Sequence, residues 1–99
     1  MKDWNGYEIT GADAAGLAQL ERAAAQLRCY IEDPVASVEQ AIAANPECVM
    51  AHVLHAWMHL LGTDAAAVAV ARDVHARALR LPANARERAH LHAIGLLLE

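Results

Sequence analysis

The chain has little of what disulfide-rich, thiolate-metal or membrane-spanning proteins need. Its 99 residues contain no Phe, two Trp, two Tyr and two Cys. Cys29 and Cys48 show no CxxC spacing, so we expect two separate thiols in a reducing cytoplasm. No apolar run reaches the roughly 18 residues of a membrane span, and residues 1–10 lack the apolar core of a secretory signal.

Catalytic signatures are equally sparse. Ser37 is the only serine, and no Gly-rich phosphate loop follows a predicted strand. The formal net charge of −4 argues against nucleic acid, which usually requires a basic surface. We therefore expect no enzymatic activity, no cofactor and no nucleic-acid or membrane partner.

Alanine and apolar residues at helical spacing dominate what is present. Hydrophobic residues make up 57 % of the chain, and alanine favours helix more than any other residue. No stretch alternates apolar and polar residues as a strand does. Apolar periodicity and capping residues, with Thr10 or Asp13 before the first helix and Asn84 before the last, predict an all-α chain of about five helices. The expected helices cover residues 13–33, 34–44, 45–63, 65–81 and 85–99.

The helix expected over residues 45–63 is the centre of the chain. Asn45 is a good N-cap, Pro46 suits the first helical position and Gly62 suits the end. Its apolar residues cover well over half of the circumference, which is too wide for a helix with one buried stripe. We expect neighbours on two sides of it.

Residues 1–11 form a polar, irregular N-terminal lead, and residues 12–99 form the helical domain. Trp4, Tyr7 and Ile9 are the lead's candidates for packing across the first helices. The apolar end of the chain, LLLE at 96–99, leads us to expect a fragment of a longer protein.

Two prolines suggest a helical repeat. Pro46 and Pro82 stand about one tetratricopeptide repeat apart, and residues 34–46, PVASVEQAIAANP, resemble the second helix of such a repeat. The blocks NPECVMAH at 45–52, LLGT at 60–63 and RERAH at 86–90 resemble the N-terminal portion of the tetratricopeptide repeat protein 38-type family. The resemblance implies antiparallel helical hairpins in a right-handed α-α superhelix, without an assigned catalytic mechanism.

The histidines are the main candidates for chemistry. His52, His55 and His59 share one helical face at i, i+3, i+7, and a pair at i, i+4 can bind one metal ion. The usual catalytic zinc motif needs a Glu after the first His, and Ala56 stands there instead. A semi-polar seam against a neighbouring helix is the alternative interpretation.

These patterns favour a protein–protein interaction or scaffold module without catalytic activity, whose partner is a protein or peptide. The alternative is a helical bundle that binds a metal or small ligand through His52, His55 and His59. A repeat array that stops after an odd helix leaves an apolar face without a neighbour. We therefore expect this chain to form homo-oligomers through its last helix, by way of Leu91, Ile94, Leu97 and Leu98.

Overall fold

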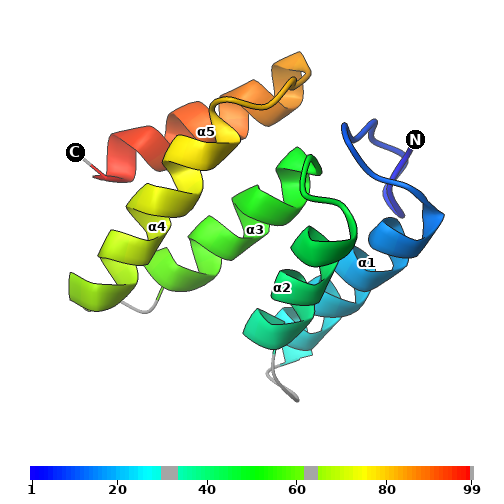
Figure 1. Cartoon of the computed structure of the whole chain (residues 1–99), viewed down its shortest axis with the longest axis horizontal. Coiled ribbons are helices and arrows are strands. Elements are labelled where there is room, and N and C mark those ends of the chain that lie inside the picture. Colours follow the sequence, from blue (N-terminus) through cyan, green and yellow to red (C-terminus); the bar gives the residue numbers. More distant parts are fainter. Residues whose placement is uncertain (30–33, 62–64, 99) are drawn as a thin grey trace.

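The computed structural model describes residues 1–29, 34–61 and 65–98 (Figure 1). They contain five helices, and none of these residues belongs to a strand, so the prediction of an all-α chain is confirmed. None of the described helices is long and apolar enough to cross a bilayer. The helices are α1 (Ala14–Cys29), α2 (Pro34–Ala44), α3 (Val49–Leu60), α4 (Ala65–Ala78) and α5 (Ala85–Leu98).

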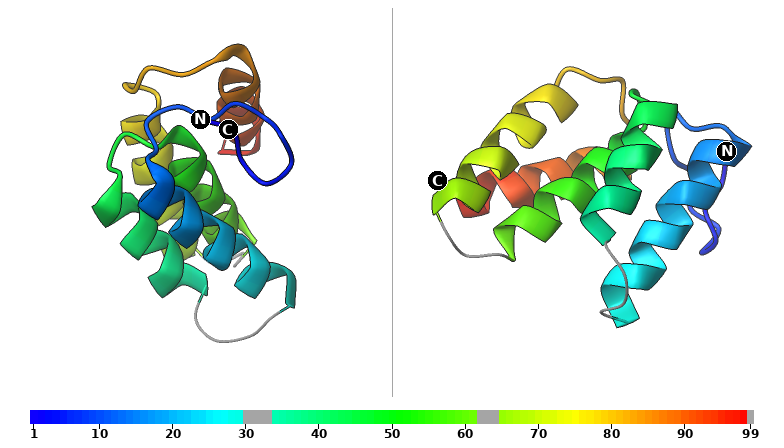
Figure 2. Two further views of the ribbon diagram at one scale, coloured as in Figure 1. Left: turned by 90° about the vertical axis from the view of Figure 1, so that its right-hand side faces the viewer. Right: turned by 60° about the horizontal axis from the view of Figure 1, so that its bottom comes forward.

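Two helical hairpins and a single helix lie side by side (Figures 1 and 2). α1 packs against α2, and α3 packs against α4. α5 then lies against both α3 and α4. Because α3 contacts α2, α4 and α5, the central position predicted for it is confirmed.

The larger hydrophobic core lies between α3, α4 and α5, and we call it the three-helix core. Each helix contributes three buried residues at the spacing of one helical face. These residues form one cluster across the three helices, and half-buried Trp57 and Leu60 pack against it. The buried members are Val49, Val53, Ala56, Ala71, Val74, Ala78, Leu91, Ile94 and Leu98.

A smaller core, the lead core, joins the N-terminal lead to α1, α2 and α3. Ile9 is buried there beside Leu20, Ala41, Cys48 and Ala51. Most of these side chains are small, which lets the backbones approach closely but buries little apolar area per residue. The lead is therefore part of the fold, as the apolar Ile9 suggested.

The connection between α2 and α3 differs from the sequence prediction. α3 begins at Val49 with Cys48 as its N-cap, and no side chain caps it. Asn45 instead accepts a hydrogen bond from the Asp13 N–H on its Oδ1 (3.1 Å), while its own carbonyl accepts from the Cys48 N–H (3.0 Å). Asn45 therefore fastens this turn to the start of α1, and its predicted role as the N-cap of α3 is wrong.

Some other helix ends agree with the sequence prediction, one differs from it, and some lie beyond the described residues. Asp13 caps α1 by accepting a hydrogen bond from the Gly16 N–H on its Oδ1 (2.8 Å), which selects Asp13 over Thr10. α4 ends at Ala78, three residues before the predicted end, while α2 has its predicted bounds. The expected ends at 32–33, Gly62 and residues 63–64 fall outside the described part of the chain.

Two glycines allow the close approaches around the turn at residues 45–48. Gly11 has a φ of +82°, and a Cβ there would collide with the carbonyl of Glu47. A Cβ at Gly16 would collide with the side chain of Asn45. Both positions therefore exclude larger residues.

Candidate functional site

The three histidines of α3 share one face, but their ring nitrogens do not converge. His52 Nε2 lies 2.8 Å from the carbonyl oxygen of Pro46, to which it donates a hydrogen bond. The Nε2 atoms of His55 and His59 lie 3.2 Å apart, with the two rings edge to face. The structure therefore brings together a pair of histidines, and it holds His52 apart from that pair.

Charged groups from α2 and α4 surround His55. Glu39 Oε1 lies 3.8 Å from His55 Nε2, and both residues line an open hollow of about 210 Å³ together with Ile42, His52 and Arg77. Burial lowers the pKa of His55, and the nearby His59 lowers it further, whereas Glu39 acts in the opposite direction. The His55 imidazole is thus held in the neutral form, which can bind a metal ion.

A full ligand set is nevertheless missing from this part of the molecule. Across residues 1–29, 34–61 and 65–98, no three His, Cys, Asp or Glu side chains are placed to hold one metal ion. The reason is local, since Pro46 engages the nitrogen that His52 would offer. A metal ion here would have two imidazole ligands and complete its coordination with water or with the mobile end of an exposed carboxylate.

A second constellation, which the sequence reasoning missed, joins the N-terminal lead to the start of α5. Asn84 Oδ1 accepts from the Glu87 N–H (2.9 Å), and Glu87 Oε1 accepts from the Asn84 N–H (3.0 Å). This reciprocal pair is a capping box. The Asn84 cap of the last helix was predicted, and the signal for the rest is a Glu three residues after that cap.

The same Glu87 carboxylate also holds the lead. Its Oε2 accepts from the Thr10 N–H (2.9 Å) and its Oε1 accepts from the Thr10 hydroxyl (2.6 Å). Glu87 has no solvent exposure, so these donors replace the water that a carboxylate otherwise needs. We call this set of bonds between Thr10, Asn84 and Glu87 the lead clasp.

The rest of the lead forms a tight loop over α1, α3 and α5. Gly6, with a φ of +83°, follows Asn5 in a turn closed by a hydrogen bond from the Asp3 N–H to the Tyr7 carbonyl (2.8 Å). The dipeptide Asn5-Gly6 is a strong turn signal, so the sequence indicates this turn. The ring of Tyr7 lies 4.2 Å from the guanidinium carbon of Arg86.

The face under this loop is apolar with one cation. Leu20 and Ala24 of α1, Met50 and Leu54 of α3, and Arg86 of α5 line a cavity beneath the lead. We call these five residues the lead face.

The expected self-association face lies mostly inside the molecule. Leu91, Ile94 and Leu98 are buried in the three-helix core. Their face of α5 packs on the preceding hairpin of α3 and α4, so it is not left exposed for a following helix. These three residues are thus not an open face, which corrects that part of the prediction. Leu97 is 61 % exposed, and it alone of the four is available to a second copy of the chain. Homo-oligomer formation itself stays a prediction.

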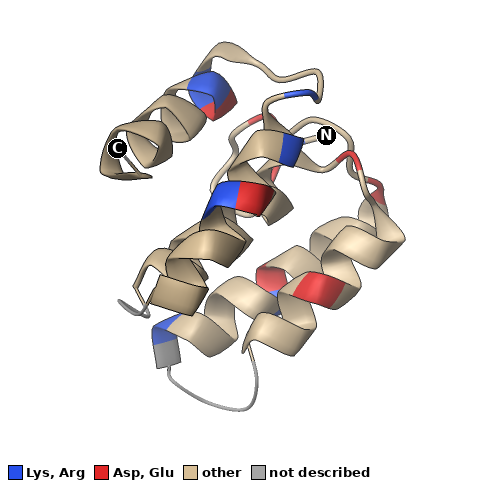
Figure 3. Ribbon diagram, turned by 60° about the vertical axis from the view of Figure 1, so that its left-hand side comes forward, with Lys and Arg blue, Asp and Glu red and all other residues tan. Residues whose placement is uncertain are grey.

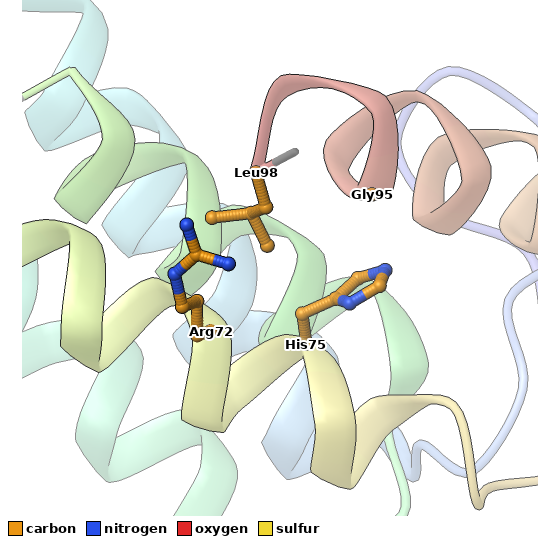
Figure 4. Close-up of a pocket in the computed structure, with 4 residues that line it drawn as sticks. All are labelled: Arg72, His75, Gly95 and Leu98. Atoms are coloured by element: carbon orange, nitrogen blue, oxygen red, sulfur yellow. The ribbon is translucent and has the colours of Figure 1, made fainter.

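Three further polar residues, His75, Ser37 and Cys48, have their roles in packing. His75 of α4 points toward α5, where its Nε2 donates a hydrogen bond to the Leu91 carbonyl (2.8 Å) and its ring lies against Gly95 (Figure 4). The Ser37 hydroxyl donates to Gln26 Oε1 (2.5 Å). Burial raises the pKa of the Cys48 thiol, which weakens it as a nucleophile.

The charges on the helices are mixed in sign (Figure 3). Arg72, Asp73 and Arg77 are exposed on α4, and Arg80 is exposed in the turn after it. The Arg77 Nε–H donates to the Asp73 carbonyl (3.4 Å). This is the pattern of a solvated helix face, and it does not form a basic groove of the kind that nucleic acid requires.

Comparison of the chain with models of protein families, with curated proteins and with solved structures finds no match. The resemblance of residues 45–52, 60–63 and 86–90 to the tetratricopeptide repeat protein 38-type family therefore remains an expectation from sequence.

Proposed function

We propose that this chain is a protein–protein interaction module built from degenerate tetratricopeptide-like hairpins, with no catalytic activity of its own. Its proposed binding surface is the lead face, and its proposed setting is the cytoplasm. The stacking of α1/α2, α3/α4 and α5 supports this proposal, because helical hairpin arrays present one side of their helices to partners.

One observation carries the proposal: the first, third and fifth helices already hold a non-helical segment of polypeptide. Ile9 supplies an apolar anchor, Thr10 supplies hydrogen bonds to Glu87, and Tyr7 stacks on Arg86. Apolar anchors combined with hydrogen bonds that fix orientation are the means by which grooves recognise peptides. A surface that binds its own extended segment has the chemistry to bind another.

Residues 1–8 of the lead are held more loosely than residues 9–11. Tyr7 is 53 % exposed and Trp4 is 37 % exposed, whereas Ile9 is 4 % exposed. A linked segment binds at an effective concentration on the order of millimolar, so weak contacts suffice to keep it in place. A partner peptide with moderate affinity can therefore displace residues 1–8.

The test uses a variant that lacks residues 1–8 and keeps Ile9, Thr10 and Gly11. A synthetic peptide of residues 1–8 is added while backbone NMR signals are followed. We expect saturable shifts at Leu20, Met50 and Arg86, weakened when the peptide carries Trp4→Ala and Tyr7→Ala. Absence of saturable shifts in a folded variant would contradict a peptide-binding lead face.

A second candidate function is transition-metal binding by His55 and His59. Two imidazole nitrogens bound to one tetrahedral ion at about 2.0–2.1 Å lie about 3.3 Å apart. The observed separation of 3.2 Å between the two Nε2 atoms is close to this value, and Glu39 adds negative charge nearby.

Calorimetric titration with Zn²⁺ tests the metal site. We expect one ion per chain, and we expect His55→Ala or His59→Ala to abolish binding. His52→Ala and the exposed control His92→Ala should retain it. Heat that fits no defined stoichiometry, or equal loss in all four variants, counts against this function.

A further inference from the structure

The cavity beneath the lead is lined by Arg86, whose buried Nη1 has no hydrogen-bond partner among the described residues. It has a volume of about 130 Å³, and Leu20, Ala24, Met50 and Leu54 form its apolar floor. Trp4 and Arg86 also line it. Two layers of apolar side chains from α1 and α3 and a single cation from α5 therefore face one space.

Arg86 lacks the partners that a guanidinium usually has. Its Nη1 is buried and has no hydrogen-bond acceptor among the described residues. The ring of Tyr7 covers the guanidinium at 4.2 Å, but a ring face does not replace an oxygen acceptor in the plane of the fork. The nearest buried carboxylate, Glu87, has its oxygens engaged by Thr10 and Asn84. A buried donor without an acceptor is rare and costly.

We propose that this cavity binds a small monocarboxylate with an unbranched apolar tail. The carboxylate would bind the guanidinium of Arg86, for which the planar fork of five donors is well suited. The tail would lie between α1 and α3 on the apolar floor. A cavity of about this volume holds roughly four or five water-sized groups, which matches the five-carbon tail of hexanoate. The site is formed by the lead face with residues 1–8 in place, so it does not require a peptide to displace them.

One acidic group also lines the cavity and opposes an anion. Asp3 Oδ1 accepts from the N–H groups of Asn5 (2.9 Å) and Tyr7 (3.0 Å), so part of its charge is already compensated. The substitution Asp3→Asn keeps an oxygen for these donors and removes the charge. It should therefore strengthen hexanoate binding.

The experiment titrates the full chain with sodium hexanoate, with hexan-1-ol and with sodium acetate. Hexan-1-ol cannot form the charge-assisted bond, so it should bind about tenfold or more weakly than hexanoate. Acetate lacks four methylenes of hexanoate, so it should bind about a hundredfold more weakly. The indole N–H signal of Trp4 should move, while that of Trp57, which packs at the three-helix core, should stay as an internal reference.

Two pairs of variants assign the binding to this cavity. Arg86→Met removes the charge and keeps the length of the chain, and the exposed Arg88→Met is its matched control on α5. Ala24→Leu fills the cavity, and the exposed Ala18→Leu is its matched control on α1. We expect Arg86→Met and Ala24→Leu each to reduce hexanoate affinity about tenfold or more, with both controls unchanged. If Arg86→Met does not fold, the Ala24 pair decides the question.

Three results would overturn the proposal. The first is equal binding of hexanoate and hexan-1-ol, which would show that no charge is recognised. The second is hexanoate binding that Ala24→Leu leaves unchanged. The third is a shift of Trp57 as large as that of Trp4, which means adsorption of the tail to apolar surface in general.

Discussion

The three-helix core and the lead core use different faces of α3 and are filled differently. Six of the nine buried side chains in the three-helix core are Val, Leu or Ile, and whole helices supply them at regular helical spacing. The lead core depends on small residues and on Ile9 from a non-helical segment. Its neighbourhood also contains directional polar links, namely the lead clasp and the buried Ser37–Gln26 hydrogen bond.

The three-helix core should supply most of the stability, and the lead core should rearrange more easily. Apolar burial is non-directional and makes the larger contribution to folding. A hydrogen bond adds only about 1 kcal/mol net, but it is lost steeply when its geometry changes. The half that contains the proposed binding face is therefore the half that can rearrange at lower cost.

Truncation in the three-helix core should have the largest effect. Ile94 has no solvent exposure, so Ile94→Ala should lower the free energy of unfolding by about 3 kcal/mol through lost burial and the cavity left behind. Urea unfolding followed by circular dichroism measures this change. Leu97→Ala on the exposed side of α5 should change stability by less than about 0.5 kcal/mol, and equal losses in the two variants would contradict the observed packing of α5.

Breaking the lead clasp should have an intermediate effect. Glu87→Gln replaces one acceptor oxygen by an amide N–H₂ group that faces donors, so we expect a loss of about 2 kcal/mol. Faster hydrogen exchange at the Ile9 and Val49 amides should accompany it, since these amides bond within and to the lead. The exposed Glu21→Gln serves as the control. Unchanged exchange at Ile9 would mean that the clasp does not hold the lead.

The sequence predicted the helices better than their contacts. Spacing of apolar residues identified all five helices. Asn84 was recognised as a cap and Asp13 was one of two candidates, because their side chains act within one turn. Leu91, Ile94 and Leu98 were expected to be open, since a pattern shows that a face is apolar without showing what covers it. The tie between Thr10 and Glu87 spans 77 residues, and no local pattern contains information about such a pairing.

The buried polar pair between α1 and α2 should matter less. Ser37→Ala removes the donor that Gln26 Oε1 accepts, which should cost about 1 kcal/mol in urea unfolding. Combining it with Gln26→Leu should cost less than the sum of the two single changes, because they share one interaction. Exposed Gln40→Ala in α2 is the control, and strictly additive losses would argue against the bond.

The smallest effect should be a dependence of stability on pH. Burial lowers the pKa of both His55 and His90. The nearby His59 lowers the pKa of His55 further, and Arg86 lowers that of His90 further. The unfolded chain therefore binds protons first as the pH falls, so stability should decrease below an ordinary histidine pKa of about 6.5 and level off below the folded-state values.

Urea unfolding between neutral and mildly acidic pH measures this slope. His55→Gln should flatten it, while exposed His92→Gln should leave it as in the parent chain. A slope that does not change in His55→Gln would assign the pH dependence to other groups.

The lead clasp also sets an order of events when the chain is made. Residue 10 leaves the ribosome well before residue 87, so the carboxylate that receives Thr10 does not yet exist while α1 to α4 are forming. Contacts between such distant residues form late, and domains mature as their segments emerge. Until α5 is complete, the lead is held only by its contacts with α1, α2 and α3 and lacks its hydrogen bonds to Glu87. During synthesis the protein therefore passes through a period in which the lead clasp has not formed. Other polypeptides can reach the α1 and α3 side of the lead face in that period.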